Sequence, residues 1–391
     1  MSLFHWISGG LLGAGWFSRV VAAALGMPDV ADITEPQWDR WPETPSGLPR
    51  VGIIVPARNE ENTIDGVLRS LVSLDYPNLE VIAVNDRSTD KTGEHMDQFA
   101  ASPTTKGRLH VVHVKELPQG WLGKTHAMWT ASQQATADWL LFTDADVFFR
   151  PDTLRRALAY AESEKADHLV LFPTMQMETP GERMMIAFFQ TMFLFGHRPW
   201  KVADARAKDH MGVGAFNLIR RSTYDSIGSY KALRMEVLDD MKLGKVVKEA
   251  GFAQRNVFGA DLLTLRWAHG AFGIVNNLTK NFFAVMSFQW WRTVAAAVAL
   301  TFINIMPFVG IWFAAGWSRS GYILAVASIF SIYVGMANRS HVPAYYCVLH
   351  PVSSTLFVYT LLRSMFVTLR DGGVTWRGTK YPLDELRKGL V

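Results

Sequence analysis

Residues 51–173 alternate short apolar runs with amphipathic stretches, which predicts strands and helices in turn. The run 51–55 is continuous and β-branched, as expected of a strand buried in a parallel sheet. Apolar residues then recur at helical spacing over 64–72, which predicts an amphipathic helix. The alternation favours an α/β fold with a mostly parallel sheet, whose polar strand ends face one crevice. Further strands are predicted over 79–84, 109–114, 139–143 and 168–173, with a helix over about 125–137.

The apolar run 139–142 ends on two acids, Asp144 and Asp146, which are separated by one residue. Residues i and i+2 of an extended strand point to the same side, so both carboxylates are expected to face one ligand. Mg²⁺ and Mn²⁺ are commonly held by one or two carboxylates together with the phosphates of a substrate. The pair therefore favours a divalent metal that presents a diphosphate; the alternative is a solvated strand end with two incidental acids.

Two later segments carry further candidate chemistry. The stretch 211–219 is interrupted by Gly212 and Gly214, and it lacks the Lys-Ser/Thr and the third glycine of nucleotide-binding loops. Its glycines are expected to let the backbone approach a sugar or a diphosphate. The stretch 235–251 is predicted to form a helix that begins near Asp239 and Asp240. Acids in a first helical turn are ordinary partners of the helix dipole, so a structural role and a catalytic role both fit this pair.

Several apolar stretches suggest a membrane protein. Residues 1–27 fit a transmembrane helix, an interfacial helix or a signal peptide, and the absence of Lys and Arg from the first eighteen residues disfavours the last. The 23 residues of 294–316 carry no charge and are long enough to cross a bilayer. Shorter apolar stretches at 322–336 and 353–369 fit spans, and the second fits a re-entrant or interfacial segment equally well.

Composition supports this interpretation. The chain of 391 residues is 49% hydrophobic, with 24 Phe and 14 Trp, and aromatic residues collect in cores and in membrane-interface belts. The net charge of +4 is mild, and no basic stripe is interleaved with aromatics, so a membrane surface or a phosphorylated substrate is favoured over nucleic acid. The single cysteine, Cys347, excludes an internal disulfide. The Met- and Phe-rich stretch 175–195 fits core packing or a lipid groove near the membrane.

Six motifs follow one another along the chain: Val-Pro-Ala-Arg-Asn-Glu-Glu (55–61), Asn-Asp-Arg-Ser-Thr-Asp (85–90), Leu-Pro-Gln-Gly-Trp-Leu-Gly-Lys-Thr-His-Ala (117–127), Phe-Thr-Asp-Ala-Asp-Val (142–147), Gly-Val-Gly-Ala-Phe (212–216) and Leu-Asp-Asp (238–240). Together they resemble the family 2 glycosyltransferases, which have a GT-A catalytic domain, over about 51–281. The segment from Gly120 to Lys124 and the closing residues 373–378 are similar to membrane-anchored bacterial enzymes that glycosylate lipids, such as hopanoid-associated and carotenoid glycosyltransferases.

The resemblance implies a role for each matching position. Asp144 and Asp146 would bind the nucleotide-sugar and its Mg²⁺ or Mn²⁺, with Asp146 the more direct metal ligand. Asp240 would be the general base, with Asp239 beside it. The remaining nucleotide-sugar contacts would come from Pro56, Glu60, Asp86, Lys124 and Gly214.

Two positions depart from the family pattern. The acidic pair, often Glu-Asp in the family, is Asp239-Asp240 here. The Gln-x-x-Arg-Trp element of processive polysaccharide synthases and ceramide enzymes is present only as Arg266-Trp267, without its Gln. Arg266 would contact the diphosphate and Trp267 the acceptor, or both would be interface residues.

We therefore expect a multi-pass protein of the inner membrane with a cytosolic catalytic domain. It would transfer a single sugar from a nucleotide-sugar, UDP-linked by preference, to a lipid hydroxyl; the alternatives are a processive polysaccharide synthase and a catalytically silent scaffold. The expected parts are an N-terminal membrane anchor (1–27), a linker (28–50), the GT-A domain (51–281), transmembrane or interfacial helices (282–369) and a basic cytosolic tail (370–391).

Overall fold

The computed structural model describes residues 2–45, 47–105 and 107–390, which group into two compact units. One unit, called here the helical unit, comprises residues 2–29, 175–200 and 266–383. The other, called here the catalytic unit, comprises the described residues within 30–174, 201–265 and 384–390. Each unit is therefore assembled from segments that are distant in the sequence.

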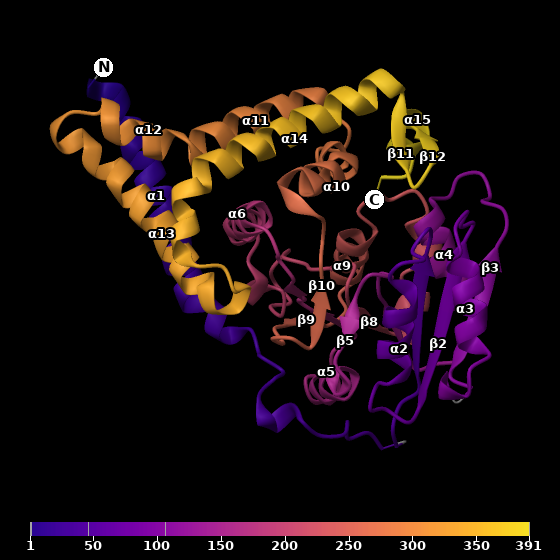
Figure 1. Cartoon of the computed structure of the whole chain (residues 1–391). Helices are drawn as coiled ribbons and strands as arrows, with labels where there is room; N and C mark the ends of the chain where they lie inside the picture. Colours follow the sequence, from indigo (N-terminus) through magenta and orange to yellow (C-terminus); the bar gives the residue numbers. More distant parts are fainter. Residues whose placement is uncertain (1, 46, 106, 391) are drawn as a thin grey trace. The chain divides into compact units, whose positions relative to one another are not determined.

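A seven-stranded sheet forms the centre of the catalytic unit, in the order β3-β2-β1-β4-β8-β6-β9 (Figure 1). All strands run parallel except β8, which pairs antiparallel with β4 and β6. All five strands predicted from the sequence are present, and the expected mostly parallel sheet is confirmed. The strands are β1 (Val51–Ala57), β2 (Leu79–Asp86), β3 (Leu109–Val114), β4 (Trp139–Phe142), β6 (His168–Leu171), β8 (Asn217–Arg220) and β9 (Gln254–Val257).

Helices pack against this sheet. Helix α4 packs on β1 and β2, and α3 packs on β2 and β3 and against α2. The predicted helix at 125–137 is shorter than expected, because the chain turns after Ser132. The core beside α4 joins residues of β1, β2 and β4 to residues of α8 and α9. The helices are α2 (Ile64–Val72), α3 (Thr92–Ala100), α4 (Gly123–Ser132), α5 (Thr153–Ser163), α7 (Arg221–Ser226), α8 (Ser229–Ala232) and α9 (Asp239–Glu249).

The strand directions bring the polar chain ends to one side of the sheet. The carboxyl ends of β1, β2 and β4 lie together because these strands are parallel. Strand β8 runs the opposite way, so its amino end, at Asn217, pairs with Phe142 at the end of β4. The glycine-containing segment before β8 therefore lies beside the acids that follow β4.

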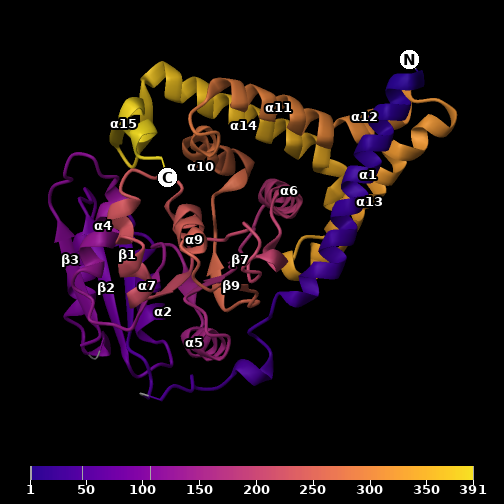
Figure 2. The ribbon, with the colours of Figure 1, turned by 180° about the vertical axis from the view of Figure 1, so that it is seen from behind.

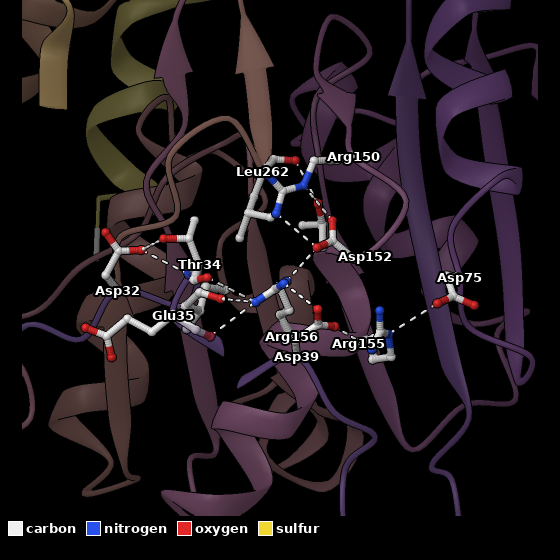
Figure 3. A network of polar contacts seen from close by, with 12 residues as sticks. Asp32, Thr34, Glu35, Asp39, Asp75, Arg150, Asp152, Arg155, Arg156 and Leu262 are labelled. Atoms are coloured by element: carbon white, nitrogen blue, oxygen red, sulfur yellow. Dashed lines mark hydrogen bonds and ion pairs between the residues drawn. The ribbon is translucent and has the colours of Figure 1, made fainter. Parts of the chain in front are cut away.

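Residues 30–39, which precede β1, are fixed to the catalytic unit by a network of charges (Figure 3). Arg156 of α5 is 7% exposed and pairs with Asp152 at 2.5 Å and Asp39 at 2.8 Å. Ile33 is fully buried, and its N–H donates to the carbonyl of Phe258. The guanidinium of Arg156 also donates to the carbonyls of Ile33, Thr34 and Glu35, at 3.2, 3.3 and 3.2 Å.

The helical unit consists of helices from both ends of the chain together with α6. In both views α1 lies beside α13, and α11 lies beside α14 (Figures 1 and 2). A short hairpin of β11 (Gly373–Trp376) and β12 (Thr379–Pro382) follows α14, and α15 (Leu383–Lys388) follows the hairpin. The main helices are α1 (Ser2–Gly26), α6 (Pro180–Gly196), α10 (Gly270–Val285), α11 (Trp290–Asn304), α12 (Met306–Phe313), α13 (Ser320–Ser340) and α14 (His350–Asp371).

Three helical segments of the described chain are long and apolar enough to cross a membrane: Leu3–Asp29, Gly316–Ser340 and Ala344–Asp371. A fourth arises only if α10 and α11, which meet at a bend of 120°, count as one span. The expectation of a single helix over 294–316 is wrong, because this stretch is divided between α11 and α12 at Ile305. Pro307 lies in the first turn of α12, where a residue without an N–H is tolerated but could not continue the preceding helix.

Glycines allow α1 and α13 to approach closely. A Cβ at Gly13 would lie 2.6 Å from the carbonyl oxygen of Gly321, and a Cβ at Gly321 would clash with the backbone of Gly9. Gly9 and Gly13 are four residues apart and therefore lie on one face of α1. This is the small-residue contact by which apolar helices associate without long side chains between them.

We predict that Gly13→Ala destabilises the helical unit by about 1–3 kcal/mol, the usual cost of overpacking a close contact. Gly10 is the matched control, because a Cβ there has no atom within 4 Å and Gly10→Ala gains helix propensity. Thermal unfolding in detergent micelles should show a lower midpoint for Gly13→Ala and an unchanged or higher one for Gly10→Ala. Equal midpoints for the two variants would contradict the close helix contact.

Candidate active site

The turn after β4 is held in place from two sides. The N–H of Thr143 donates to the carbonyl of Ile54 in β1, and its hydroxyl donates to the carbonyl of Ala215 at 2.8 Å. The N–H of Asp144 donates to the carbonyl of Gly214 at 3.0 Å. The backbone that carries Asp144 and Asp146 is thus fixed by β1 and by the segment before β8.

Lys124 lies between two carboxylates that come from different elements. From the second position of α4, its ammonium contacts Asp144 Oδ1 at 2.8 Å and Asp239 Oδ2 at 3.3 Å. Burial disfavours the charge on Lys124, but the carboxylates of Asp144, Asp239 and Asp240 outweigh burial and raise its pKa above the usual value. The lysine is therefore a permanent cation that joins the acids after β4 to the acidic start of α9.

The two acids at the start of α9 differ in their partners. Burial raises the pKa of Asp239 to about 7, although Lys124 opposes the rise. Burial also raises the pKa of Asp240, which has two backbone donors instead of an ion pair. The N–H of Gly214 reaches Asp240 Oδ2 at 2.8 Å, and the N–H of Met241 reaches Oδ1 at 2.7 Å. A carboxylate with a raised pKa and a fixed orientation is suited to accept a proton.

Gly212 and Gly214 were expected to let the backbone lie close to a sugar or a diphosphate. In the structure, both glycines lie close to other groups of the protein. A Cβ at Gly214 would clash with the carboxylate of Asp144, and a Cβ at Gly212 would clash with the carbonyl of Asp240. These glycines therefore let the segment before β8 pass between the acids that follow β4 and the start of α9.

Asp146 lies among like charges, which suits a cation. Burial and the carboxylates of Asp144 and Glu60 together raise its pKa to about 7, although Lys124 opposes the rise. Among the described residues, no group of three or more His, Cys, Asp or Glu side chains is placed to hold a metal. The acids thus fit Mg²⁺ or Mn²⁺ of the kind that takes one or two protein carboxylates and completes its shell with substrate phosphates.

The positions expected to contact a nucleotide lie at the ends of β1 and β2. Pro56 in β1 pairs with Val84 in β2, two residues before Asp86. Asp86 is buried and accepts from Arg87 Nε at 2.7 Å, and a Cβ at Gly123 would clash with its carboxylate. The carboxylate of Asp86 therefore lies against the start of α4, with its orientation fixed by Arg87.

Arg266 and Trp267 belong to the helical unit, where both have structural contacts. Arg266 pairs with the buried Glu182 at 2.9 Å and with Glu178 at 2.5 Å. Glu182 completes a capping box at the start of α6 and accepts from the N–H of Gly270 at 2.7 Å, so the arginine joins the starts of α6 and α10. Trp267 packs against Phe189, with ring centroids 4.8 Å apart. Contact of Arg266 with the diphosphate and of Trp267 with the acceptor stays a prediction beside these structural contacts.

Three buried polar residues near the site, His168, Asn217 and Gln254, belong to no motif found in the sequence. Each lies at the start of a strand, where a polar residue before an apolar run resembles an ordinary strand boundary. Only their mutual hydrogen bonds, which join β6, β8 and β9, reveal that they act together.

We predict that Lys124→Met lowers the free energy of unfolding by about 2 kcal/mol, because it leaves Asp239 buried without its cation. The expected loss is smaller than for an ion pair in which both carboxylate partners are fully buried, because Asp144 is 39% exposed and water can solvate it. Lys245→Met is the control, because Lys245 makes only a surface pair with Glu249 at 3.8 Å. Chemical denaturation of both variants measures the difference, and equal losses would contradict the central role of Lys124.

Comparison with known proteins agrees with this geometry. Residues 52–241 match the model of the glycosyl transferase family 2. A 4,4'-diaponeurosporenoate glycosyltransferase of Staphylococcus aureus (strain MRSA252) is 22% identical over 344 residues, which cover 85% of this chain and 88% of the relative. The mannosyltransferase PcManGT from Pyrobaculum calidifontis, solved with GDP-Man and Mn²⁺, is 18% identical with a TM-score of 0.55, over 94% of this chain and 99% of that one. The expected GT-A fold is confirmed, and the chain is a glycosyltransferase with a family 2 domain over residues 52–241.

Proposed function

We propose that this glycosyltransferase moves one sugar from a nucleotide-sugar to the hydroxyl of a membrane lipid, with inversion and with a divalent metal. The observation that carries the proposal is the linked set of acids: Asp144 is joined to Asp239 through Lys124 and to Asp240 through Gly214. These contacts fix the position of Asp240, the candidate base, relative to Asp144, which is proposed to bind the cation together with Asp146.

The chemistry follows from these positions. The oxygen of the acceptor hydroxyl forms a bond to the anomeric carbon of the sugar. Asp240 accepts the proton of that hydroxyl as the bond forms. The bond from that carbon to the diphosphate breaks, and the nucleoside diphosphate leaves with the electron pair. A divalent cation held by Asp146 and Asp144 would neutralise the charge that builds on the diphosphate. One base opposite the leaving group gives a single displacement, which inverts the anomeric configuration.

A lipid acceptor is supported by two observations. The helical unit contains three segments that are long and apolar enough to cross a membrane, and these segments would anchor the protein in a bilayer. The relative from Staphylococcus aureus is named for transfer to 4,4'-diaponeurosporenoate. We place the protein in the inner membrane as a multi-pass protein, with its catalytic unit in the cytosol, where nucleotide-sugars are made.

A nucleotide-sugar donor and a metal are supported by the chemistry of the acids and by a similar fold. The solved mannosyltransferase was captured with GDP-Man and Mn²⁺. In this chain, burial and the carboxylates of Asp144 and Glu60 raise the pKa of Asp146, and a divalent cation would offset this negative charge. We favour a UDP-sugar as donor, and the experiment below includes GDP-sugars.

The detergent-solubilised protein is predicted to transfer one sugar to a lipid when it is supplied with UDP- and GDP-sugars, a total lipid extract, and Mg²⁺ or Mn²⁺. Mass spectrometry should show one lipid heavier by a single sugar residue, and EDTA should remove this product. A product with several added sugars would support a processive synthase instead. No turnover of any donor would support a catalytically silent scaffold.

Asp240→Asn and Asp146→Ala are predicted to separate catalysis from donor binding. Asp240→Asn removes only the base, so kcat should fall by about 10²–10⁴-fold while donor binding is retained. Asp146→Ala should lose the metal-dependent part of donor binding. Asp225→Asn is the control, because Asp225 is exposed and pairs only with Arg221 on the surface of α7. Initial rates and calorimetric titration of the donor, with and without Mn²⁺, measure both effects; normal turnover by Asp240→Asn would exclude it as the base.

A further inference from the structure

The segment 211–214 contacts acids of the site on both sides. Its Gly214 N–H donates to Asp240 Oδ2, and its Gly214 carbonyl accepts from the N–H of Asp144. A displacement of this segment would therefore move or release the carboxylate proposed as the base. What holds the segment in place consequently matters for the reaction.

A buried chain of three polar side chains holds this segment. Gln254 Oε1 accepts from the N–H of Met211 at 2.8 Å. At the other end of the chain, Asn217 Nδ2 donates to the carbonyl of Val213 at 2.7 Å. His168 lies between them, with Nδ1 at 2.8 Å from Gln254 Nε2 and Nε2 at 3.1 Å from Asn217 Oδ1. The two ends of one short segment are thus tied to a single side-chain network.

Donors and acceptors match throughout the network. The amide nitrogen of Gln254 donates to His168 Nδ1, so the ring proton resides on Nε2 and is donated to the carbonyl oxygen of Asn217. The amide nitrogen of Asn217 is then the donor to Val213. All three side chains are at most 1% exposed, and each of their side-chain nitrogen and oxygen atoms has a hydrogen-bond partner. Burial lowers the pKa of His168 to about 4, which keeps the ring neutral, as the network requires.

Gln254 also reaches the helix that carries the base. Its amide nitrogen donates to the carbonyl of Gly244 in α9 at 3.1 Å. A Cβ at Gly244 would clash with the carbonyl of Met211, so the helix and the segment lie in direct backbone contact. One glutamine side chain therefore fixes the segment and α9 relative to each other.

We propose that Gln254, supported by His168 and Asn217, is a positioning residue for the transfer reaction, because it sets the location of Asp240 through segment 211–214 and α9. This inference rests on the proposed function, in which Asp240 is the general base. Their hydrogen bonds reach the backbone of Met211 and Val213 in the segment and of Gly244 in α9, so their effect passes through the backbone.

The test compares Gln254→Leu with Asn256→Leu in the full-length solubilised protein. Asn256 is the matched control: it is a buried residue of the same strand, two positions away, and its amide nitrogen has no hydrogen-bond partner in the described part of the chain. Both variants replace a buried amide by a similar apolar group. Thermal unfolding is measured for each, so that a general loss of stability is recorded separately.

Gln254→Leu should lower kcat by about 10²-fold, the effect of a misplacement of about 1 Å, and change the donor KM by less than about threefold. Hydrogen–deuterium exchange should rise in peptides covering 211–216 and the start of α9. Asn256→Leu should show neither effect. His168→Gln, which can keep one donor and one acceptor, should retain more activity than Gln254→Leu at a similar midpoint of unfolding.

Equal loss of kcat in Gln254→Leu and Asn256→Leu, or unchanged exchange at 211–216 in Gln254→Leu, would overturn the inference. If Gln254→Leu does not accumulate, Asn217→Ser, which removes the contact with Val213, takes its place in the same comparison. Failure of the wild-type protein to transfer any sugar would instead overturn the proposed function. The exchange comparison would still decide whether the network holds the segment, so the two failures are distinguishable.

Discussion

The site depends on how this fold accommodates four carboxylates in a small, poorly solvated region. Asp144, Asp146, Asp239 and Asp240 repel one another, and burial raises the pKa of three of them, Asp146, Asp239 and Asp240. The protein supplies one cation, Lys124, between Asp144 and Asp239, and two backbone N–H groups for Asp240. The pKa of Asp146 stays raised although Lys124 opposes the rise, so Asp146 is the position where a divalent cation would complete the charge balance.

The second constraint is the close packing of backbone against backbone at the start of α9. Gly212 and Gly244 allow the segment before β8 to lie directly on the helix, and a side chain at either position would force them apart. The polar network of Gln254, His168 and Asn217 then holds this segment from its other side. Apolar packing alone would leave the segment free to slide, whereas hydrogen bonds with matched donors and acceptors define one position.

In the helical unit, close glycine contacts and pairing of opposite charges again hold elements together, and here these elements are helices. Glycines set the contact between α1 and α13, and a buried ion pair between Arg266 and Glu182 joins the starts of α6 and α10. Arg266 shows how one residue type supports two hypotheses from sequence, since an arginine suits a diphosphate and a helix-capping glutamate equally well. In the structure Arg266 pairs with Glu182 and Glu178, and a contact with the diphosphate stays a prediction.

The sequence by itself determined the alternating strands, the acids that follow β4 and those that start α9, because apolar periodicity and residue spacing are local properties. It could not show that Lys124 joins these acids or that Gly214 lies against both. It also left His168, Asn217 and Gln254 unnoticed. These features depend on which strands become neighbours, and the antiparallel insertion of β8 between β4 and β6 decided that. Long-range pairing is a property of the whole fold, so only the tertiary structure reveals it.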